Sequence, residues 1–260
     1  MKIQDDDVLI IEGARTAVGS FLGSLCDVSA TELGAIAAKG AIERAKISPE
    51  AIDNIYFGNV IQSSKDSAYI ARHVGLKAGV PVATPALTLN RACASGLDAI
   101  IEAGKSLRCG DASYALAGGA ENMSMTPYAM RGVRRGWKMI KSDVDDMLFS
   151  ALHDPMAGCS IGETVEHLAG ELGIGREAAD AAAVWSQERA RAAQSSGALR
   201  KSCPSCKRSG AKRPSLIATK TFDPRPRLRP SLACPDCSGR KESSPQETPV
   251  ASTTQALLWS

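Results

Sequence analysis

Apolar runs and polar stretches alternate along the first half of the chain, and this pattern predicts strands that alternate with helices. The predicted strands are residues 8–11, 52–60, 85–90 and 114–117, and the predicted helices are residues 31–45, 68–78 and 94–107. The apolar runs lack an alternation of period two, as is typical of strands covered on both faces. This order predicts an α/β fold, with a mostly parallel sheet covered by helices.

The predicted helix at residues 31–45 has the clearest pattern. Its apolar face combines Leu33, Ile36, Ala37, Gly40 and Ala41. Ser29 and Glu32 have the spacing of a capping box, in which each side chain bonds the other residue's backbone N–H. We therefore expect the helix to begin next to Ser29 and to bury the face that contains Leu33.

Cys93 lies at the predicted turn between the strand 85–90 and the helix 94–107. The N-terminus of a helix carries a partial positive charge, which favours a thiolate over a thiol. The neighbours are small and leave space beside the sulfur: Ala92, Ala94, Ser95 and Gly96. These features indicate a nucleophile that takes up an acyl group. The alternative is a buried cysteine that packs as a small apolar residue.

The segment Asn-Arg-Ala-Cys-Ala-Ser-Gly at residues 90–96 resembles the nucleophile loop of the thiolases, which make or break carbon–carbon bonds between acyl-coenzyme A units. Three more segments, residues 15–23, 118–124 and 160–166, are similar to thiolase motifs and follow in the family's order. Together the motifs cover residue 8 to about residue 197. By this resemblance the chain is identified as a member of the thiolase family, similar to the N-terminal half of its fold.

The resemblance implies thiolase-type acyl transfer between coenzyme A thioesters by a ping-pong route, with Cys93 as the nucleophile that carries the acyl group. It suggests Leu152 and Ser160 as coenzyme A contacts, although Ser160 stands where many thiolases have a histidine. Acyl-CoA or acetyl-CoA are the implied substrates, in fatty acid metabolism, with no separate cofactor and no metal. The family implies a homodimer or homotetramer, and no nucleic-acid or membrane partner is expected.

A complete thiolase also uses an activating histidine, a second cysteine and an asparagine, from motifs in its C-terminal half. Those motifs do not occur in this sequence, and His73, His153 and His167 match no catalytic motif. We therefore expect little turnover from this chain, and a helix after Cys93 whose apolar face is left exposed. The alternative function is a non-catalytic protein that binds coenzyme A or another partner.

The composition changes near residue 198. Residues 1–199 contain 19 basic and 24 acidic residues, whereas residues 200–260 contain 12 basic and 4 acidic ones. This tail is rich in proline and cysteine and lacks helical or strand periodicity, so disorder is the expected state. The expected divisions are 1–121 for the α/β core, 122–197 for a partial loop domain and 198–260 for the tail.

Three further interpretations of the tail are open. The pairs Cys203/Cys206 and Cys234/Cys237 suggest a zinc site, although the 27 residues between them exceed the usual spacing. The basic residues suggest nucleic-acid contacts, but aromatic residues that stack on bases are few. The third hypothesis is a one-base frameshift at Gly197, because the shifted frame can encode two thiolase motifs in order. The frameshift explains the most and makes the cysteine pairs accidental.

The N-terminus and the apolar runs bear on location. No run approaches the roughly eighteen apolar residues of a membrane helix, and the first residues lack the features of a signal peptide. We expect a cytoplasmic protein in which Cys26, Cys109 and Cys159 are reduced structural cysteines.

Overall fold

The computed structural model describes residues 7–136 and 144–197 of the 260-residue chain. Their contacts form two compact units, residues 7–154 and residues 155–196. The predicted division at residue 121 stays a prediction. The expectations for residues 198–260, namely disorder, a zinc site, nucleic-acid contacts and a frameshift, lie outside the described residues.

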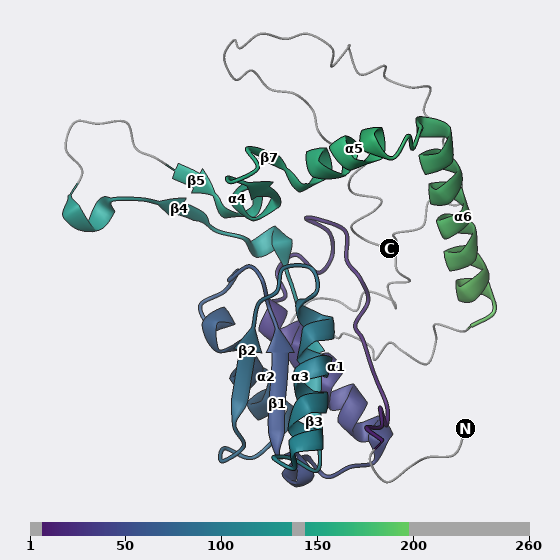
Figure 1. The fold of residues 1–260 in the computed structure, drawn as a ribbon. Coiled ribbons are helices and arrows are strands. Elements are labelled where there is room, and N and C mark those ends of the chain that lie inside the picture. The colour runs from purple at the N-terminus through teal and green to yellow at the C-terminus, as the bar shows by residue number, and fades with distance from the viewer. Residues whose placement is uncertain (1–6, 137–143, 198–260) are drawn as a thin grey trace. The chain divides into compact units, whose positions relative to one another are not determined.

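Three parallel strands form the sheet of the first unit (Figure 1). β1 (Asn54–Gly58) is central and lies between β2 (Ala86–Leu89) and β3 (Ala115–Gly119). In the register, Ile55 of β1 lies opposite Leu116 of β3. Each strand overlaps a run that the apolar pattern predicts, so the α/β class and the parallel sheet are confirmed.

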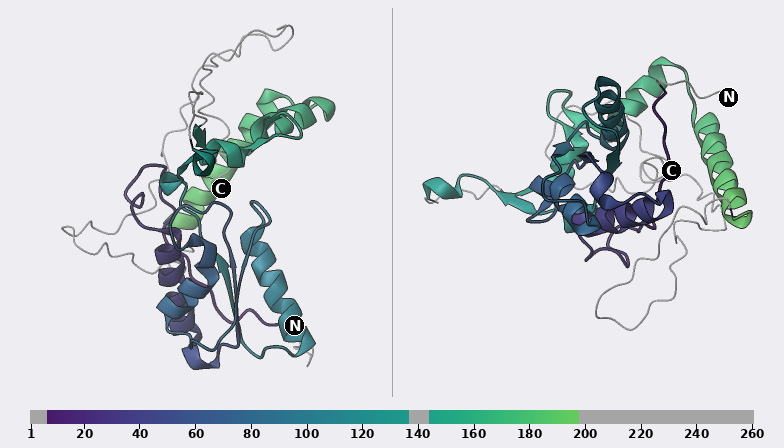
Figure 2. Two further views of the ribbon diagram at one scale, coloured as in Figure 1. Left: turned by 90° about the vertical axis from the view of Figure 1, so that its left-hand side faces the viewer. Right: turned by 90° about the horizontal axis from the view of Figure 1, so that it is seen from below.

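Helices cover both faces of this sheet (Figure 2). α1 (Ala30–Ala45) and α2 (Ile70–Ala78) lie on one face, and α3 (Ser95–Cys109) lies on the other. Side chains alternate across a strand, so Ile55 and Phe57 of β1 both point toward α1 and α2, where they are almost fully buried. The core of the unit lies in this layer and also contains Ala38, Ile42, Ile70, Val74 and Leu116.

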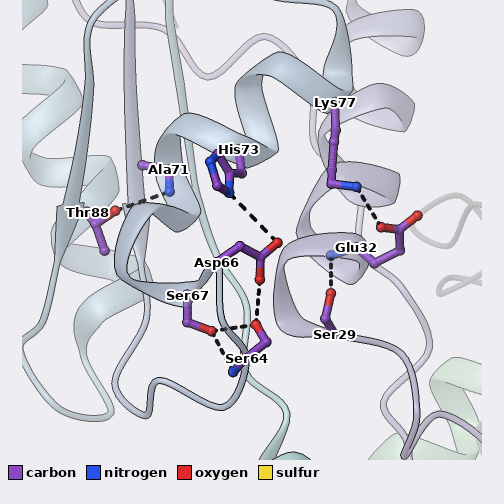
Figure 3. A network of polar contacts seen from close by, with 9 residues as sticks. All are labelled: Ser29, Glu32, Ser64, Asp66, Ser67, Ala71, His73, Lys77 and Thr88. Carbon is purple, nitrogen blue, oxygen red and sulfur yellow. Dashed lines mark hydrogen bonds and ion pairs between the residues drawn. The ribbon is translucent and has the colours of Figure 1, made fainter.

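α1 begins where the capping pattern predicts. The Ser29 hydroxyl accepts a hydrogen bond from the Glu32 N–H at 3.2 Å, and the Glu32 carboxylate pairs with Lys77 of α2 at 3.0 Å (Figure 3). Of the predicted face, Gly40 is buried, but Leu33, Ile36, Ala37 and Ala41 are only half-buried, because the adjacent side, where Gly34 lies against the ring of Phe57, faces inward. The buried residues of α1 are Ala30, Thr31, Gly34, Ala35, Ala38, Gly40 and Ile42.

Residues 8–11 form no strand, which contradicts the prediction. All four side chains are exposed, and that of Ile10 is 80% exposed. A strand needs a hydrogen-bonded neighbour, and none of the described strands pairs with this segment. Apolar composition alone therefore does not make these residues part of the sheet.

The rest of the first unit consists of short elements. They are η1 (Pro49–Ala51), η2 (Ser67–Tyr69), η3 (Met123–Met125), β4 (Tyr128–Met130), η4 (Val133–Arg135), β5 (Val144–Asp146), α4 (Met147–Leu152) and β6 (His153–Asp154). β4 and β5 pair antiparallel. The Asp146 carboxylate caps α4 by accepting the Leu148 N–H at 2.8 Å, so this helix begins directly after β5.

Two helices dominate the second unit. β7 (Cys159–Ser160) precedes α5 (Ile161–Glu171), and α6 (Arg176–Ser195) follows. Within residues 155–196, neither helix has a buried residue. The Arg189 guanidinium lies over the ring of Trp185, 4.5 Å from its centroid. Across the described parts of the chain, every helix is too short or too polar to span a membrane.

Candidate functional site

Cys93 lies in a tight turn between the end of β2 and the start of α3, and its side chain is exposed. The predicted strand, turn and helix are confirmed, and the alternative of a buried packing cysteine is wrong. The residue before it, Ala92, has a positive φ of 49°, a conformation that costs a residue with a side chain about 1–2 kcal/mol. Other contacts must therefore hold this turn in place.

Hydrogen bonds hold Ala92 from two sides. Its N–H donates to Oδ1 of Asn90 at 3.0 Å, and its carbonyl accepts from the N–H and the hydroxyl of Ser95, at 3.0 and 2.6 Å. The Ser95 hydroxyl in turn accepts the Arg91 N–H at 2.8 Å. We call residues 90–95 the elbow. Together these hydrogen bonds fix the backbone on both sides of Cys93.

The first turn of α3 lies directly on the ends of two strands. Gly58 ends β1 and is opposite Gly119, which ends β3. A Cβ on Gly58 would lie 2.6 Å from the backbone carbon of Ser95, and one on Gly119 would lie 3.2 Å from Cα of Gly96. The two glycines therefore allow the helix that follows Cys93 to contact the sheet without an intervening side chain.

α3 carries its larger apolar side chains on the side away from the sheet. The buried residues Ser95, Ala99, Ala103 and Ser106 are all small. In contrast, Leu97, Ile100 and Ile101 are 63%, 42% and 44% exposed. These three residues, which we call the outer face of α3, confirm the expectation that the helix after Cys93 leaves an apolar surface exposed.

Two polar residues that follow β3 bind the backbone of two other loops. Burial raises the pKa of Glu121, although hydrogen bonds from the Val60 and Ile61 N–H groups and from the Asn59 amide oppose this shift. Asn122 is buried and donates to the carbonyls of residues 25, 26 and 28, the shortest at 2.7 Å. In the sequence, Glu121 and Asn122 stand out only as members of the motif at residues 118–124, and their hydrogen-bond partners cannot be identified from it.

A second polar network ties α2 to its surroundings (Figure 3). The hydroxyl of Ser64 donates to Asp66 at 2.6 Å, and Asp66 pairs with His73 at 3.8 Å. Burial raises the pKa of Asp66, but the bonds it accepts, that from Ser64 foremost, outweigh burial and leave its pKa below the usual value. Thr88 of β2 accepts the Ala71 N–H at 3.2 Å. His73 is half-buried, and its ring also lies 5.8 Å from that of Tyr69.

The other histidines lie elsewhere. His153 stacks on Phe149 with ring centroids 5.6 Å apart, and His167 is exposed on α5. Within residues 7–136 and 144–197, no histidine forms a hydrogen bond with Cys93. The remaining described cysteines are free thiols: Cys26 and Cys159 are half-buried, and Cys109 is exposed at the end of α3.

The two suggested coenzyme A contacts lie in different units. Leu152 is the last residue of α4 in the first unit and is half-buried. Ser160 is in the second unit, where its hydroxyl accepts the Glu163 N–H at 3.2 Å and so caps α5. The described residues contain no group of three or more side chains able to hold a metal ion.

Comparison with known proteins gives a consistent result. A family model described as thiolase, N-terminal domain, matches residues 8–222. Mitochondrial 3-ketoacyl-CoA thiolase of Mus musculus is 44% identical over 191 residues, which are 73% of this chain and 48% of the relative. Beta-ketothiolase of Cupriavidus necator is 42% identical over 191 residues, which are 74% of this chain and 48% of that relative. The chain thus spans about half the length of the curated relatives it matches.

Solved structures agree with this fold. Human mitochondrial 3-ketoacyl-CoA thiolase in complex with CoA is similar with a TM-score of 0.72 and 40% identity, covering 74% of this chain and 49% of that one. Acetyl-CoA acetyltransferase of Bacillus anthracis has the same TM-score with 32% identity, and the match covers 77% of this chain and 51% of that one. The similarity therefore includes the three-dimensional arrangement as well as the motifs.

Proposed function

Because the chain belongs to the thiolase family, we propose that Cys93 is the acyl-accepting nucleophile of a thiolase-type acyltransferase. The observation that carries the proposal is the exposed Cys93 thiol at a rigid elbow, with small neighbours on both sides. The relatives named as thiolases and acetyltransferases support the same reaction class. The human structure in complex with CoA supports coenzyme A thioesters as substrates.

In the proposed step, Sγ of Cys93 attacks the carbonyl carbon of an acyl-CoA. A new carbon–sulfur bond forms, the bond to the coenzyme A sulfur breaks, and coenzyme A leaves as a thiol with the proton that Cys93 loses. The exposed thiol, two residues before α3 begins, gives the thioester access. The acyl group then moves from Cys93 to the α-carbon of a second acyl-CoA: a carbon–carbon bond forms, the carbon–sulfur bond to Cys93 breaks, and the proton lost from that α-carbon returns the sulfur to a thiol.

Other parts of the reaction are proposals from the family resemblance. We propose that Leu152 and Ser160 contact coenzyme A, which for Ser160 competes with its bond to the Glu163 N–H. The proposal includes a role in fatty acid metabolism, a cytoplasmic location and a homodimer or homotetramer. The relatives include mitochondrial and bacterial proteins, so location needs its own measurement.

The second half-reaction needs groups beyond Cys93. We propose that the chain accepts an acyl group on Cys93 with little turnover, because the family's motifs for the activating histidine, the second cysteine and the asparagine do not occur in the given sequence. The test is incubation of the full chain with acetyl-CoA, followed by peptide mass spectrometry. We expect one acetyl group on Cys93, none there in Cys93→Ala, and no change in Cys109→Ala, the matched control at the other end of α3.

Three results separate this proposal from others. Acetylation that is absent from Cys93, or equal at Cys109, would overturn the nucleophile assignment. Steady release of coenzyme A would overturn the expectation of little turnover. Binding of coenzyme A without acylation would favour the non-catalytic alternative. The exposed outer face of α3 supports the other form of that alternative, contact with a partner.

A further inference from the structure

The carboxyl ends of all three strands carry a polar residue that reaches toward a neighbouring strand. Asn59 follows β1, Asn90 follows β2, and Glu121 lies two residues after β3. The Asn59 amide donates to Oε1 of Glu121 at 3.0 Å and to the carbonyl of Ala120 at 3.0 Å. The strand ends are therefore joined by side chains beyond the last bonds of the sheet.

Glu121 fixes the turn that follows β1. Its carboxylate accepts the Val60 N–H at 2.9 Å and the Ile61 N–H at 3.3 Å. These bonds orient the Val60 carbonyl, which accepts the amide of Asn90 at 3.3 Å. The same turn is tied to β2 because the Asn59 N–H donates to the Leu89 carbonyl at 3.1 Å.

Asn90 passes this constraint on to the elbow. Its Nδ2 donates to Val60, and its Oδ1 accepts the Ala92 N–H at 3.0 Å, so one side chain connects the anchored turn to the residue before Cys93. Ala92 is the residue in the left-handed conformation. We propose that Asn90 and Glu121 are positioning residues, which hold Ala92 in this conformation and so present the Cys93 thiol.

The inference rests on the proposed function in one respect, since it takes Cys93 as the reacting residue. Its test does not require a thioester. Iodoacetamide alkylates exposed thiols directly, and Cys109 of the same helix is an exposed internal reference. The ratio of alkylation rates at Cys93 and Cys109, measured by peptide mass spectrometry on the full chain, reports the elbow while general unfolding changes both rates.

We expect Asn90→Ala to lower this ratio roughly three- to tenfold, the effect of losing about one hydrogen bond. Asn54→Ala is the matched control, because Asn54 bonds Ser106 near the other end of α3 at 3.1 Å, and it should leave the ratio unchanged. Ala92→Gly in the Asn90→Ala background should restore the ratio to within about twofold, because glycine adopts a positive φ without a penalty. Glu121→Gln should lower the ratio in the same direction, since an amide has one accepting oxygen instead of two.

The proposal is overturned if Asn90→Ala and Asn54→Ala give the same ratio, or if Ala92→Gly restores nothing. If Asn90→Ala does not fold, Glu121→Gln is compared with Asn54→Ala instead. We expect the same decrease in the alkylation ratio, and an equal ratio in the two variants would overturn the proposal. The outcomes also separate the two proposals. A lower ratio in a protein that acetyl-CoA does not acylate would support the positioning role and overturn the proposed function.

Discussion

Gly58 offers a sharp test of how the fold positions Cys93. In Gly58→Ala, the new Cβ would lie 2.6 Å from the backbone carbon of Ser95, 2.7 Å from its Cβ and 2.8 Å from its carbonyl oxygen. Ordinary contacts begin at 3.4 Å, so the first turn of α3 must move away from the sheet by about 0.8 Å. The neighbouring atoms are mostly backbone, and no side-chain rotation relieves the clash.

Overpacking of this kind costs about 1–3 kcal/mol, so we expect a loss of about 2 kcal/mol in the free energy of unfolding. With a denaturant slope of about 2 kcal/mol per molar urea, the unfolding midpoint should fall by about 1 M. Cys93 precedes Ser95 by two residues, so the elbow moves with the helix. A displacement near 1 Å can lower a rate about 100-fold, and we expect acylation or alkylation of Cys93 to slow by at least about tenfold.

The assays are urea unfolding followed by circular dichroism and the alkylation rate of Cys93. Gly104→Ala is the matched control, because a Cβ there has no atom within 4 Å and the residue lies in the same helix. It should raise stability by about 0.5–1 kcal/mol and leave the Cys93 rate unchanged. If Gly58→Ala unfolds at the wild-type midpoint and reacts at the wild-type rate, α3 does not depend on contact at Gly58.

Three further predictions concern charge, the outer face and a helix cap. Asp53 accepts the Ser113 N–H at 2.7 Å, which holds its pKa below the usual 3.8, so its contribution to stability is complete above that pH and is lost as pH falls through the lower folded-state value. Asp53→Asn should therefore lower the urea midpoint at pH 6, with a difference from wild type that shrinks toward pH 2; a constant difference would contradict this. Replacing Leu97 and Ile101 with lysine should reduce self-association in sedimentation velocity with little change in stability, since both side chains are exposed, whereas equal association would exclude the outer face as the contact. Ser160→Ala should weaken α5 by about 1 kcal/mol, seen as faster amide hydrogen exchange in its first turn, while Ser160→Thr retains the cap; equal exchange in both variants would contradict the capping role.

The sequence predicted the parts of the fold that depend on local pattern. β1 and β2 lie inside predicted apolar runs, β3 overlaps one, and Cys93 lies at the predicted boundary between strand and helix. A strand and its following helix are encoded by neighbouring residues, so the elbow is visible in one short segment. The start of α1 next to Ser29 is predictable for the same reason.

The failures involve partners that the local pattern does not specify. Residues 8–11 have strand composition, but no described strand pairs with them. The inward face of α1 is chosen by close contact with Phe57, which favours Gly34 over the larger Leu33. Glu121 acts on a turn 60 residues earlier in the chain, so only the folded structure shows what it holds.

One packing arrangement explains both the rigid elbow and the exposed outer face of α3. The helix contacts the sheet closely because its inward residues are small, and a larger side chain at Ala99 or Ala103, both buried, would push its first turn away from Gly58. Close contact therefore excludes large side chains from the sheet side and leaves Leu97, Ile100 and Ile101 on the other. Association through this face would remove these exposed side chains from water. The lysine substitutions on the outer face should thus change association without changing Cys93 reactivity. Gly58→Ala should instead change Cys93 reactivity more than association. A single variant that moved both properties equally would show that the two sides of α3 are coupled.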